Sequence, residues 1–180
     1  MGPFVLSSTP MSSKKGVSIH LGLGSNLGER FDYLQKSVDL LREKVSEMRL
    51  SAIYESAAWG FEDQGDFLNA AVAGRTQLSP QELLAFAKDI ESQLGREPTF
   101  RNGPRVIDID ILIYGDTQMQ EGPLMIPHPS LMLRSFVLQP LVDLSPDLIP
   151  PGSEKSLRET LAAFDPGDLH PHYVQQFKAQ

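Results

Sequence analysis

The pattern of apolar and polar residues along the chain predicts six elements of regular structure. Alternation of apolar and polar residues is typical of β-strands, whereas apolar residues spaced three or four positions apart are typical of amphipathic helices. The predicted elements are a strand at 17–23, a helix at about 28–48, strands at 49–55 and 67–76, a helix at 79–95 and a strand at 106–113. This β-α-β-β-α-β order predicts an α+β fold with a ferredoxin-like core, in which two helices cover one face of an antiparallel sheet.

Two turns carry residues that favour the start of a helix. Ser79, Pro80 and Glu82 match a capping box with proline at the first helical position. In the earlier glycine-rich turn, Asn26 is predicted to cap the following helix, with Glu29 completing a second capping box. A dinucleotide-binding loop is not supported there, because the glycine spacing is wrong and the lysine of a phosphate-binding loop is missing.

The sequence after residue 115 is punctuated by proline and is predicted to add C-terminal helices to the core. A rigid turn at 127–136 leads into a short helix, and a further helix is expected near 155–163. From Asp165 onward the composition predicts a mobile tail, in which the run from His170 to His172 is interpreted as incidental. The predicted organisation is a disordered tail at 1–15, a single domain at 16–164 and a C-terminal tail at 165–180.

Composition narrows the class of protein. The chain has 180 residues, of which 41% are hydrophobic, so it can bury one substantial core. It contains no cysteine, which excludes disulfides and cysteine-ligated zinc and fits a cytoplasmic location. The 16 basic and 23 acidic residues give a net charge of -7, which argues against binding to nucleic acid. No apolar run is long enough to span a membrane, and no apolar stripe is left unassigned, so we expect a monomer.

The stretch from Arg101 to Gly115 carries the strongest sign of chemistry. Asp108 and Asp110 alternate with isoleucines, so both carboxylates are predicted to lie on one face of a strand, opposite Ile107, Ile109, Ile111 and Ile113. Like charges this close need a compensating cation, and Mg²⁺ commonly binds one or two carboxylates together with substrate phosphates. Arg105, in the turn before the strand, is suited to bind a phosphate through two hydrogen bonds.

Two other interpretations of the Asp pair stay open at this point. The carboxylates could face water on an edge strand and discourage edge-to-edge pairing. Asp-x-Asp pairs also hold metal–nucleotide complexes in glycosyltransferases and nucleotidyltransferases. The isoleucine face and the arginines at 101 and 105 favour a metal site over an edge strand.

A longer pattern connects these residues to a known family. The run Arg-x-Gly-Pro-Arg-x-x-Asp-x-Asp, here Arg101 to Asp110, resembles the signature of the 6-hydroxymethyl-7,8-dihydropterin pyrophosphokinases. The resemblance extends in order over about residues 17–150. Its other matching positions are 24–27, Tyr54, 66–71, Glu91, Arg96, 127–129, Arg134, Phe136 and 140–141. Because that family moves a pyrophosphoryl group from ATP to a pterin alcohol, the resemblance implies a folate-pathway enzyme that releases AMP.

The resemblance also implies roles for individual residues. Asp108 and Asp110 are expected to hold two Mg²⁺ ions that bridge the phosphates of ATP, and Arg96 and Arg105 are expected to act with them in catalysis. The residues expected to contact ATP are Glu91, Arg96, Arg105, Ile111, His128 and Arg134. Those expected to bind 6-hydroxymethyl-7,8-dihydropterin are Ser56, Ala57, Trp59, Phe67, Asn69, Asn102 and Phe136. The two phenylalanines are expected to stack on the pterin, and ordinary core packing is the alternative for them.

The chain departs from the family pattern at four positions. Asn102, Pro98, Pro123 and Met125 stand where relatives carry an aromatic residue, an arginine, an arginine and a threonine, so secondary ATP contacts are expected to differ. Loops at 56–66 and 96–104 are expected to close over the substrates. Two other functions remain as alternatives: a different metal-dependent nucleotidyl- or glycosyltransferase, and a ferredoxin-like ligand-binding module without catalysis.

Overall fold

The computed structural model describes residues 15–165 and 171–179, which contain an antiparallel sheet. The strand order is β5-β1-β4-β3-β8, and β2 also pairs with β4. These strands are β1 (Val17–Ser25), β2 (Val45–Leu50), β3 (Ile53–Ser56), β4 (Phe67–Thr76), β5 (Asp108–Tyr114) and β8 (His172–Gln175). A separate hairpin consists of β6 (Met119–Glu121) and β7 (Leu124–Ile126). The architecture is therefore a mixed one of helices on an antiparallel sheet.

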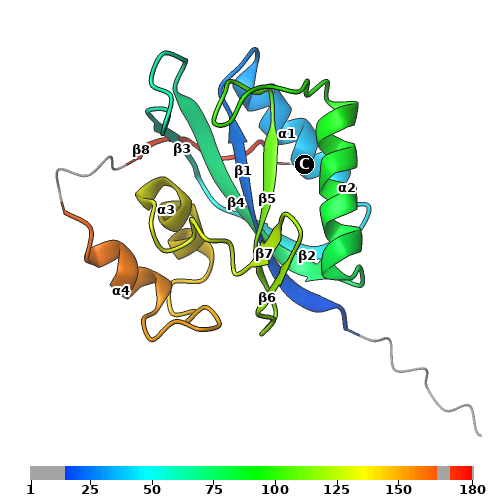
Figure 1. The fold of residues 1–180 in the computed structure, drawn as a ribbon, viewed down its shortest axis with the longest axis vertical. Coiled ribbons are helices and arrows are strands. Elements are labelled where there is room, and N and C mark those ends of the chain that lie inside the picture. Colours follow the sequence, from blue (N-terminus) through cyan, green and yellow to red (C-terminus); the bar gives the residue numbers. More distant parts are fainter. Residues whose placement is uncertain (1–14, 166–170, 180) are drawn as a thin grey trace, which may run out of the picture.

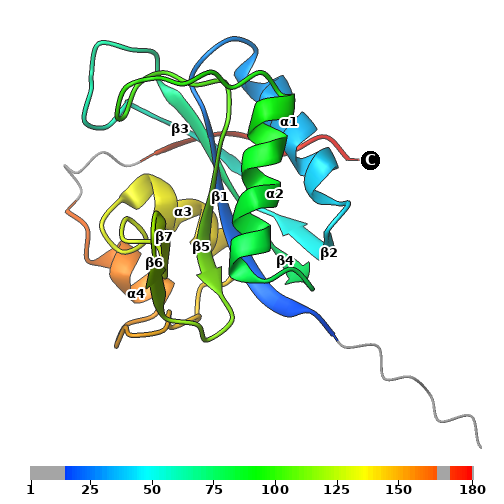
Figure 2. The same cartoon turned by 45° about the vertical axis from the view of Figure 1, so that its right-hand side comes forward.

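Helices cover both faces of this sheet. They are α1 (Arg30–Leu41), α2 (Pro80–Gln93), α3 (Ser135–Leu144) and α4 (Leu157–Ala162). Figures 1 and 2 show α1 and α2 together on one side of the sheet and α3, followed by α4, on the other. The two helices predicted after residue 115 correspond to α3 and α4. No helix in the described ranges is both long and apolar enough to cross a membrane.

Alternating side chains on β4 divide the core into two parts. Leu68, Ala70 and Val72 belong to the cluster that contains the buried residues of α1 and α2. Ala71 and Ala73 belong to the cluster formed with α3 and α4. This division follows from the two-residue period of a strand. The short side chains of these alanines let α3 pack close to this face of the sheet. The candidate site lies on the same face.

The predicted capping box at the start of α2 is confirmed, but the one before α1 is not. The Ser79 hydroxyl accepts from the Glu82 amide at 3.2 Å, and the Glu82 carboxylate accepts from the Ser79 amide at 2.8 Å. Gly95, with φ of +87°, follows the end of this helix. At α1, Glu29 stands at the N-cap without a side-chain cap, and Asn26 bonds to two loops instead. The prediction failed because a long-range partner outcompeted the local one.

The predicted helix at 28–48 is wrong over its last part. α1 ends at Leu41, and Val45 begins β2, which pairs with the end of β4. Val45 and Met48 keep a helical spacing from Leu41, and both pack in the same core from the strand. Pairing with β4 supplies the backbone hydrogen bonds here, so tertiary context overrides local periodicity. The predicted strand at 49–55 is accordingly divided between β2 and β3.

The predicted isoleucine face of β5 is correct only for its first part. Ile107, Ile109 and Ile111 lie in the α1–α2 cluster, whereas Ile113 lies in the α3–α4 cluster. The reason is a shift in the register between β1 and β5 at His20, which interrupts the alternation. The shift falls beyond the paired aspartates, so it leaves them on one face.

The C-terminal segment adds an edge strand, so the predicted mobile tail is wrong for residues 172–175. These residues form β8 against β3. Tyr173 packs edge to face on Tyr54, with ring centroids 6.2 Å apart, and Phe177 packs against the α1–α2 cluster. Residues 166–170 and 1–14 lie outside the described residues, and with them His170 and nearly all of the predicted N-terminal tail.

His20 is a buried link between β1 and the end of α3. Its Nε2 lies 2.9 Å from the Ser145 hydroxyl oxygen, and the neighbouring Arg49 donates to the Leu144 carbonyl at 2.6 Å. Burial, with the charge of Arg49 as a smaller cause, lowers the pKa of His20 from 6.5 to about 4. Both causes disfavour the charged imidazolium in the folded protein.

We expect His20 to make folding stability depend on pH between about 6.5 and 4. In the unfolded chain the ring binds a proton below pH 6.5, but in the folded chain it stays neutral to about pH 4, so acid favours unfolding. This effect reaches about 3 kcal/mol at the low end. Denaturant unfolding of the wild type and His20→Gln at pH 7 and pH 4.5 tests it. The stability of the wild type relative to His20→Gln should be lower at pH 4.5 than at pH 7, and a difference that stays constant would contradict the assignment.

Candidate active site

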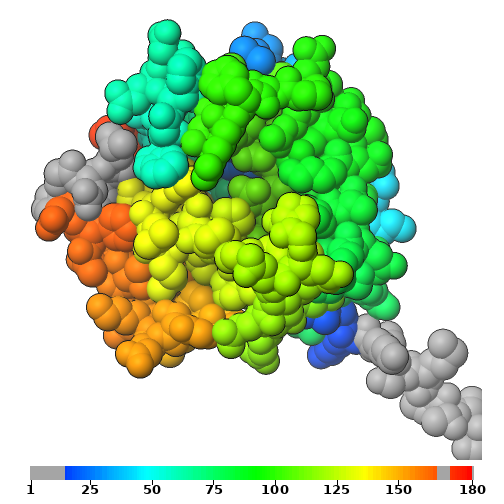
Figure 3. All heavy atoms as spheres, viewed as in Figure 1, coloured from blue at the N-terminus to red at the C-terminus, as the bar shows by residue number. Residues whose placement is uncertain are grey.

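A pocket opens on the α3 face of the sheet, below the loop 57–66 and the loop 94–107. Figure 3 shows a hollow between these loops and the segment that leads into α3. Most of the predicted site residues line it, although they come from five separate parts of the chain. These are Ser56, Ala57, Trp59, Phe67, Asn69, Asn102, Arg105, Asp108, Asp110, His128, Arg134 and Phe136.

The floor of the pocket is set by the register of three strands. On β1, Gly24 lies opposite Asp108 of β5, and Gly22 lies opposite Asp110. On its other side, Gly24 lies opposite Asn69 of β4. Residues directly opposite each other project on the same face, so the glycines leave open space between the carboxylates and the Asn69 amide. A Cβ atom at Gly24 would already contact the Phe67 ring at 3.5 Å.

Two arginines hold Asp108. Its Oδ1 lies 2.7 Å from Nη1 of Arg96, and its Oδ2 lies 3.0 Å from Nη2 of Arg105. Burial by itself would raise the pKa of Asp108, but the charges of Arg105 and Arg96 outweigh it and hold this pKa below its ordinary value. Asp108 is therefore ionised at neutral pH.

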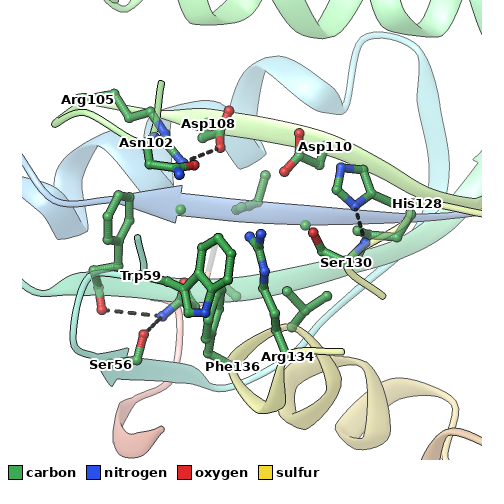
Figure 4. Close-up of a pocket in the computed structure, with 18 of the residues that line it drawn as sticks. Ser56, Trp59, Asn102, Arg105, Asp108, Asp110, His128, Ser130, Arg134 and Phe136 are labelled. Atoms are coloured by element: carbon green, nitrogen blue, oxygen red, sulfur yellow. Dashed lines mark hydrogen bonds and ion pairs between the residues drawn. The ribbon is translucent and has the colours of Figure 1, made fainter. Parts of the chain in front are cut away.

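Asp110 lies in a different environment on the same strand face (Figure 4). No ion pair among the described residues reaches it. Burial, and then repulsion from Asp108, raises the pKa of Asp110 to about 7. A divalent cation beside the pair would offset both effects by adding positive charge.

The donor set fits Mg²⁺ better than a transition metal. In the described part of the chain, no three His, Cys, Asp or Glu residues are grouped to hold a metal. Among the described residues that line the pocket, Asp108 and Asp110 carry the carboxylate groups. Such a sparse set suits Mg²⁺, which keeps several waters and binds jointly to substrate phosphates.

Three predicted ATP contacts are not part of the pocket lining: Glu91, Arg96 and Ile111. Glu91 is 3% exposed; it accepts from the Ile109 amide at 2.7 Å and pairs with Arg96 at 2.9 Å. Through these contacts it anchors β5 and orients Arg96 towards Asp108. The Ile111 side chain is buried in the α1–α2 cluster, on the opposite face.

Aromatic and amide groups occupy the side of the pocket away from the aspartates (Figure 4). Asn69 donates to the Ser56 hydroxyl at 2.9 Å, which fixes the orientation of its amide. The guanidinium carbon of Arg105 lies 5.0 Å from the Phe67 ring centre, and that of Arg134 lies 4.0 Å from the Trp59 ring. The two phenylalanines predicted to stack on a ligand are therefore wall residues of the pocket rather than core residues.

His128 is held as a hydrogen-bond donor to the pocket. Its Nδ1 accepts from the Ser130 amide at 3.1 Å, so the proton of the neutral ring resides on Nε2. Burial, and then the positive charge of Arg134, lowers the pKa of His128, although Asp108 opposes them. The ring is therefore neutral at pH 7 and offers an N–H group.

Asn26 joins the two loops above the pocket. Its Nδ2 donates to the Gln64 side chain at 2.8 Å and to the Gly65 carbonyl at 3.0 Å, and its Oδ1 accepts from the Arg105 amide at 2.9 Å. Gln64 in turn donates to the Asn102 carbonyl at 2.7 Å. One buried amide thus fixes the C-terminal ends of both loops relative to β1.

An aromatic pair adds a second contact between the loops. The rings of Phe61 and Phe100 meet edge to face, with centroids 4.9 Å apart. Asn102 adopts the left-handed conformation with φ of 60°, and its side chain lies against Gly60. The two loops thus contact each other in this structure, and their closure over bound substrates stays a prediction.

Sequence reasoning missed seven lining residues, namely Gly22, Leu23, Gly24, Ala70, Leu112, Ser130 and Val137. Leu112 continues the alternation that begins at Asp108 and Asp110, so the strand period could have found it. The glycines gave a weaker signal, because their importance depends on which strand lies beside β1. No signal for Ser130 exists without the turn that folds it onto His128.

Comparison with known proteins identifies the family. The profile of the 7,8-dihydro-6-hydroxymethylpterin-pyrophosphokinases matches residues 20–146. The chain belongs to this family. A relative from Aquifex aeolicus, named 2-amino-4-hydroxy-6-hydroxymethyldihydropteridine pyrophosphokinase, is 45% identical over 142 residues, which cover 79% of this chain and 89% of that protein. A protein of the same name from Methylorubrum extorquens is 43% identical over 152 residues, which cover 83% of this chain and 95% of that protein.

Solved structures of larger proteins share the fold. A crystal structure of Plasmodium falciparum HPPK-DHPS superposes with a TM-score of 0.67 at 14% identity over 84% of this chain. The present chain spans 45% of that protein. At this level of identity the likeness concerns the fold alone.

We expect Asn26→Ala to loosen both loops. The substitution leaves the Arg105 amide and the loop acceptors without their partner, which costs roughly 1–3 kcal/mol of unfolding free energy. Asn26→Asp is the matched control, because it keeps the acceptor for Arg105 but loses the two donated bonds. Denaturant unfolding and limited proteolysis of residues 57–66 report the effect, which should be larger for alanine. An alanine variant with wild-type stability and proteolysis would refute the role assigned to Asn26.

Proposed function

We propose that this family member transfers the pyrophosphoryl group of ATP to the hydroxymethyl group of 6-hydroxymethyl-7,8-dihydropterin, giving AMP and the pterin diphosphate in folate biosynthesis. The observation that carries the proposal is the arrangement within one pocket. An aspartate pair flanked by arginines and a recess of aromatic and amide groups share a glycine floor. A phosphate donor and a flat acceptor would therefore meet above Gly22 and Gly24.

The nucleotide side of the pocket is suited to a triphosphate. Arg105 and Arg134 line it, and Arg96 supports Asp108 from just outside. A guanidinium group can donate two parallel hydrogen bonds to phosphate oxygens, and the neutral His128 adds one more N–H donor. We assign Arg105, Arg134 and His128 to the stabilisation of charge that develops as AMP leaves.

Asp108 and Asp110 are assigned to two Mg²⁺ ions. When bound, these ions would neutralise negative charge on the triphosphate. This would reduce the electrostatic repulsion between the phosphates and an attacking oxygen nucleophile. The elevated pKa of Asp110, about 7, supports a cation beside this pair, because the ionised form is otherwise disfavoured there. The protein's own task is then to hold both carboxylates on one rigid strand.

The acceptor side of the pocket is suited to a flat heterocycle. Phe67 and Phe136 offer ring faces for stacking, and the fixed amide of Asn69 can both donate to and accept from the edge of a pterin. Ser56, Ala57, Trp59 and Asn102 complete this side. The hydroxymethyl group would then point across the glycine floor to the phosphates.

The reaction needs no covalent enzyme intermediate. The pterin hydroxyl oxygen bonds to the β-phosphorus of ATP, the bond from that phosphorus to the α,β-bridging oxygen breaks, and AMP leaves with the electron pair while the hydroxyl proton passes to solvent. Catalysis consists of positioning and electrostatic stabilisation.

We also propose the finer features that accompany this function. The strand order β5-β1-β4 with β2 and β3 beside β4 supports a ferredoxin-like core with added C-terminal elements. The absence of cysteine from the sequence is compatible with action in the cytoplasm. We assign a monomer with no nucleic-acid or membrane partner, in line with its acidic net charge of -7.

Replacing either aspartate should greatly slow product formation while leaving the fold intact. We expect Asp108→Asn and Asp110→Asn to lower kcat by roughly 10²–10³-fold, because each removes a negative ligand from the charge-stabilising centre. Incubation with ATP, Mg²⁺ and 6-hydroxymethyl-7,8-dihydropterin, followed by chromatography for AMP and the pterin diphosphate, measures this.

Asp116→Asn is the matched control, because Asp116 is exposed and lies just beyond the end of β5. It should retain wild-type turnover. Near-normal turnover in Asp110→Asn would contradict the assignment of Asp110 as a Mg²⁺ ligand. Wild-type protein that is folded but forms neither AMP nor the pterin diphosphate would overturn the proposed function, and turnover of a nucleotide sugar would favour a different transferase.

A further inference from the structure

The Trp59 indole covers the guanidinium group of Arg134 at the centre of the pocket. The guanidinium carbon lies 4.0 Å from the Trp59 ring centre and 5.9 Å from the Phe136 ring centre. Trp59 comes from the loop between β3 and β4, whereas Arg134 stands at the N-cap of α3 (Figure 4). A single stacking contact therefore links the loop on the acceptor side to a cation on the nucleotide side.

Arg134 has no stronger partner in the described part of the chain. No carboxylate there forms an ion pair with it. Arg105 and Arg101 lie near enough to repel its charge, and Asp110 attracts it only from a distance beyond an ion pair. The guanidinium group therefore rests on an aromatic face, which is a weak interaction beside a charge-assisted hydrogen bond to a phosphate.

The indole belongs to neither hydrophobic cluster. Trp59 is 48% exposed, while the preceding Ala58 is only 6% exposed and anchors the loop. Gly60 follows with φ of 86°, and Asn26 and Gln64 hold the other end of the loop. The loop backbone is thus fixed on both sides of Trp59, and the stack on Arg134 determines where the indole lies.

We propose that Trp59 is a positioning residue that couples the two substrates. Its stack on Arg134 covers the aromatic recess until nucleotide phosphates take Arg134, and the released indole then lies on the flat acceptor. The inference rests on the proposed function, because Arg134 must bind phosphate and the acceptor must be flat. Since coupling is reciprocal, each substrate tightens the binding of the other through this contact.

The size of the coupling follows from the strength of the contact. A stack of a cation on tryptophan corresponds to a change in affinity of roughly 2- to 30-fold. We expect 6-hydroxymethylpterin to bind more tightly by a factor of this order when Mg²⁺ and α,β-methylene-ATP are present. In Trp59→Leu this share of the enhancement should disappear, and Trp59→Phe, which keeps an aromatic face, should restore part of it. Isothermal titration calorimetry with and without the analogue measures these ratios.

The indole itself provides a second readout, because Trp59 is the only tryptophan in the chain. Addition of Mg²⁺ and α,β-methylene-ATP without pterin should shift its emission as the guanidinium leaves the ring. Arg134→Met should place the emission near the nucleotide-bound position from the start and remove the response. Arg42→Met is the matched control, because this exposed arginine at the end of α1 lies outside the pocket and should leave the shift unchanged.

The outcomes separate this inference from the proposed function. If calorimetry shows that the analogue binds to the wild type but the emission does not change, the coupling role of Trp59 is overturned while the function stands. The same holds if Trp59→Leu keeps the wild-type enhancement of pterin binding. If the wild type binds no analogue, both fail together. If it binds both ligands with coupling but forms no AMP, the proposed function alone fails.

Discussion

The site depends on the antiparallel pairing of β1 between β4 and β5. This pairing sets Gly24 beside both Asp108 and Asn69, and Gly22 beside Asp110. A slip of one residue in either pairing would turn these side chains to the opposite face, into the apolar cluster of α1 and α2. Gly22 and Gly24 keep the pocket open, because side chains at those positions would fill the space that separates the carboxylates from the Asn69 amide. The rest of the pocket is arranged on this floor.

The two aspartates beside the glycine floor of the pocket differ in their charged partners. Arg96 and Arg105 satisfy Asp108, and Glu91 fixes Arg96 from behind. Asp110, two residues along the same strand, has no such partner among the described residues, and its pKa is raised to about 7. One carboxylate is thus preformed as an anion, while the other becomes fully ionised only with added positive charge nearby. Arginines gathered at this site, together with a bound cation, can give an acidic protein a local positive charge that binds a polyanion.

The loops around the pocket are connected to one another and to the floor. Asn26 follows directly on β1 and bonds to both loops, and Phe61 and Phe100 hold the loops together further out. A movement of one loop is therefore expected to shift the other, and the Trp59–Arg134 contact extends this connection to α3. The C-terminal strand β8 supports the same region from the other side, because it pairs with β3, whose last residue, Ser56, orients Asn69.

Local sequence pattern determined most of the elements and the shared strand face of the Asp pair. The period of two placed Asp108 and Asp110 on one face, and the capping box at Ser79 began α2 where expected, because both depend on residues close together in the chain. The motif pointed to the family and named most of the residues that line the pocket. Tertiary structure decided what depends on distant partners. Val45 and Met48 joined a strand because β4 lay beside them, Asn26 bonded to loops and not to a helix, and Glu91 became an anchor buried behind β5. These outcomes follow from the competition between local and long-range hydrogen bonds and burial, and only the folded chain brings those competitors together.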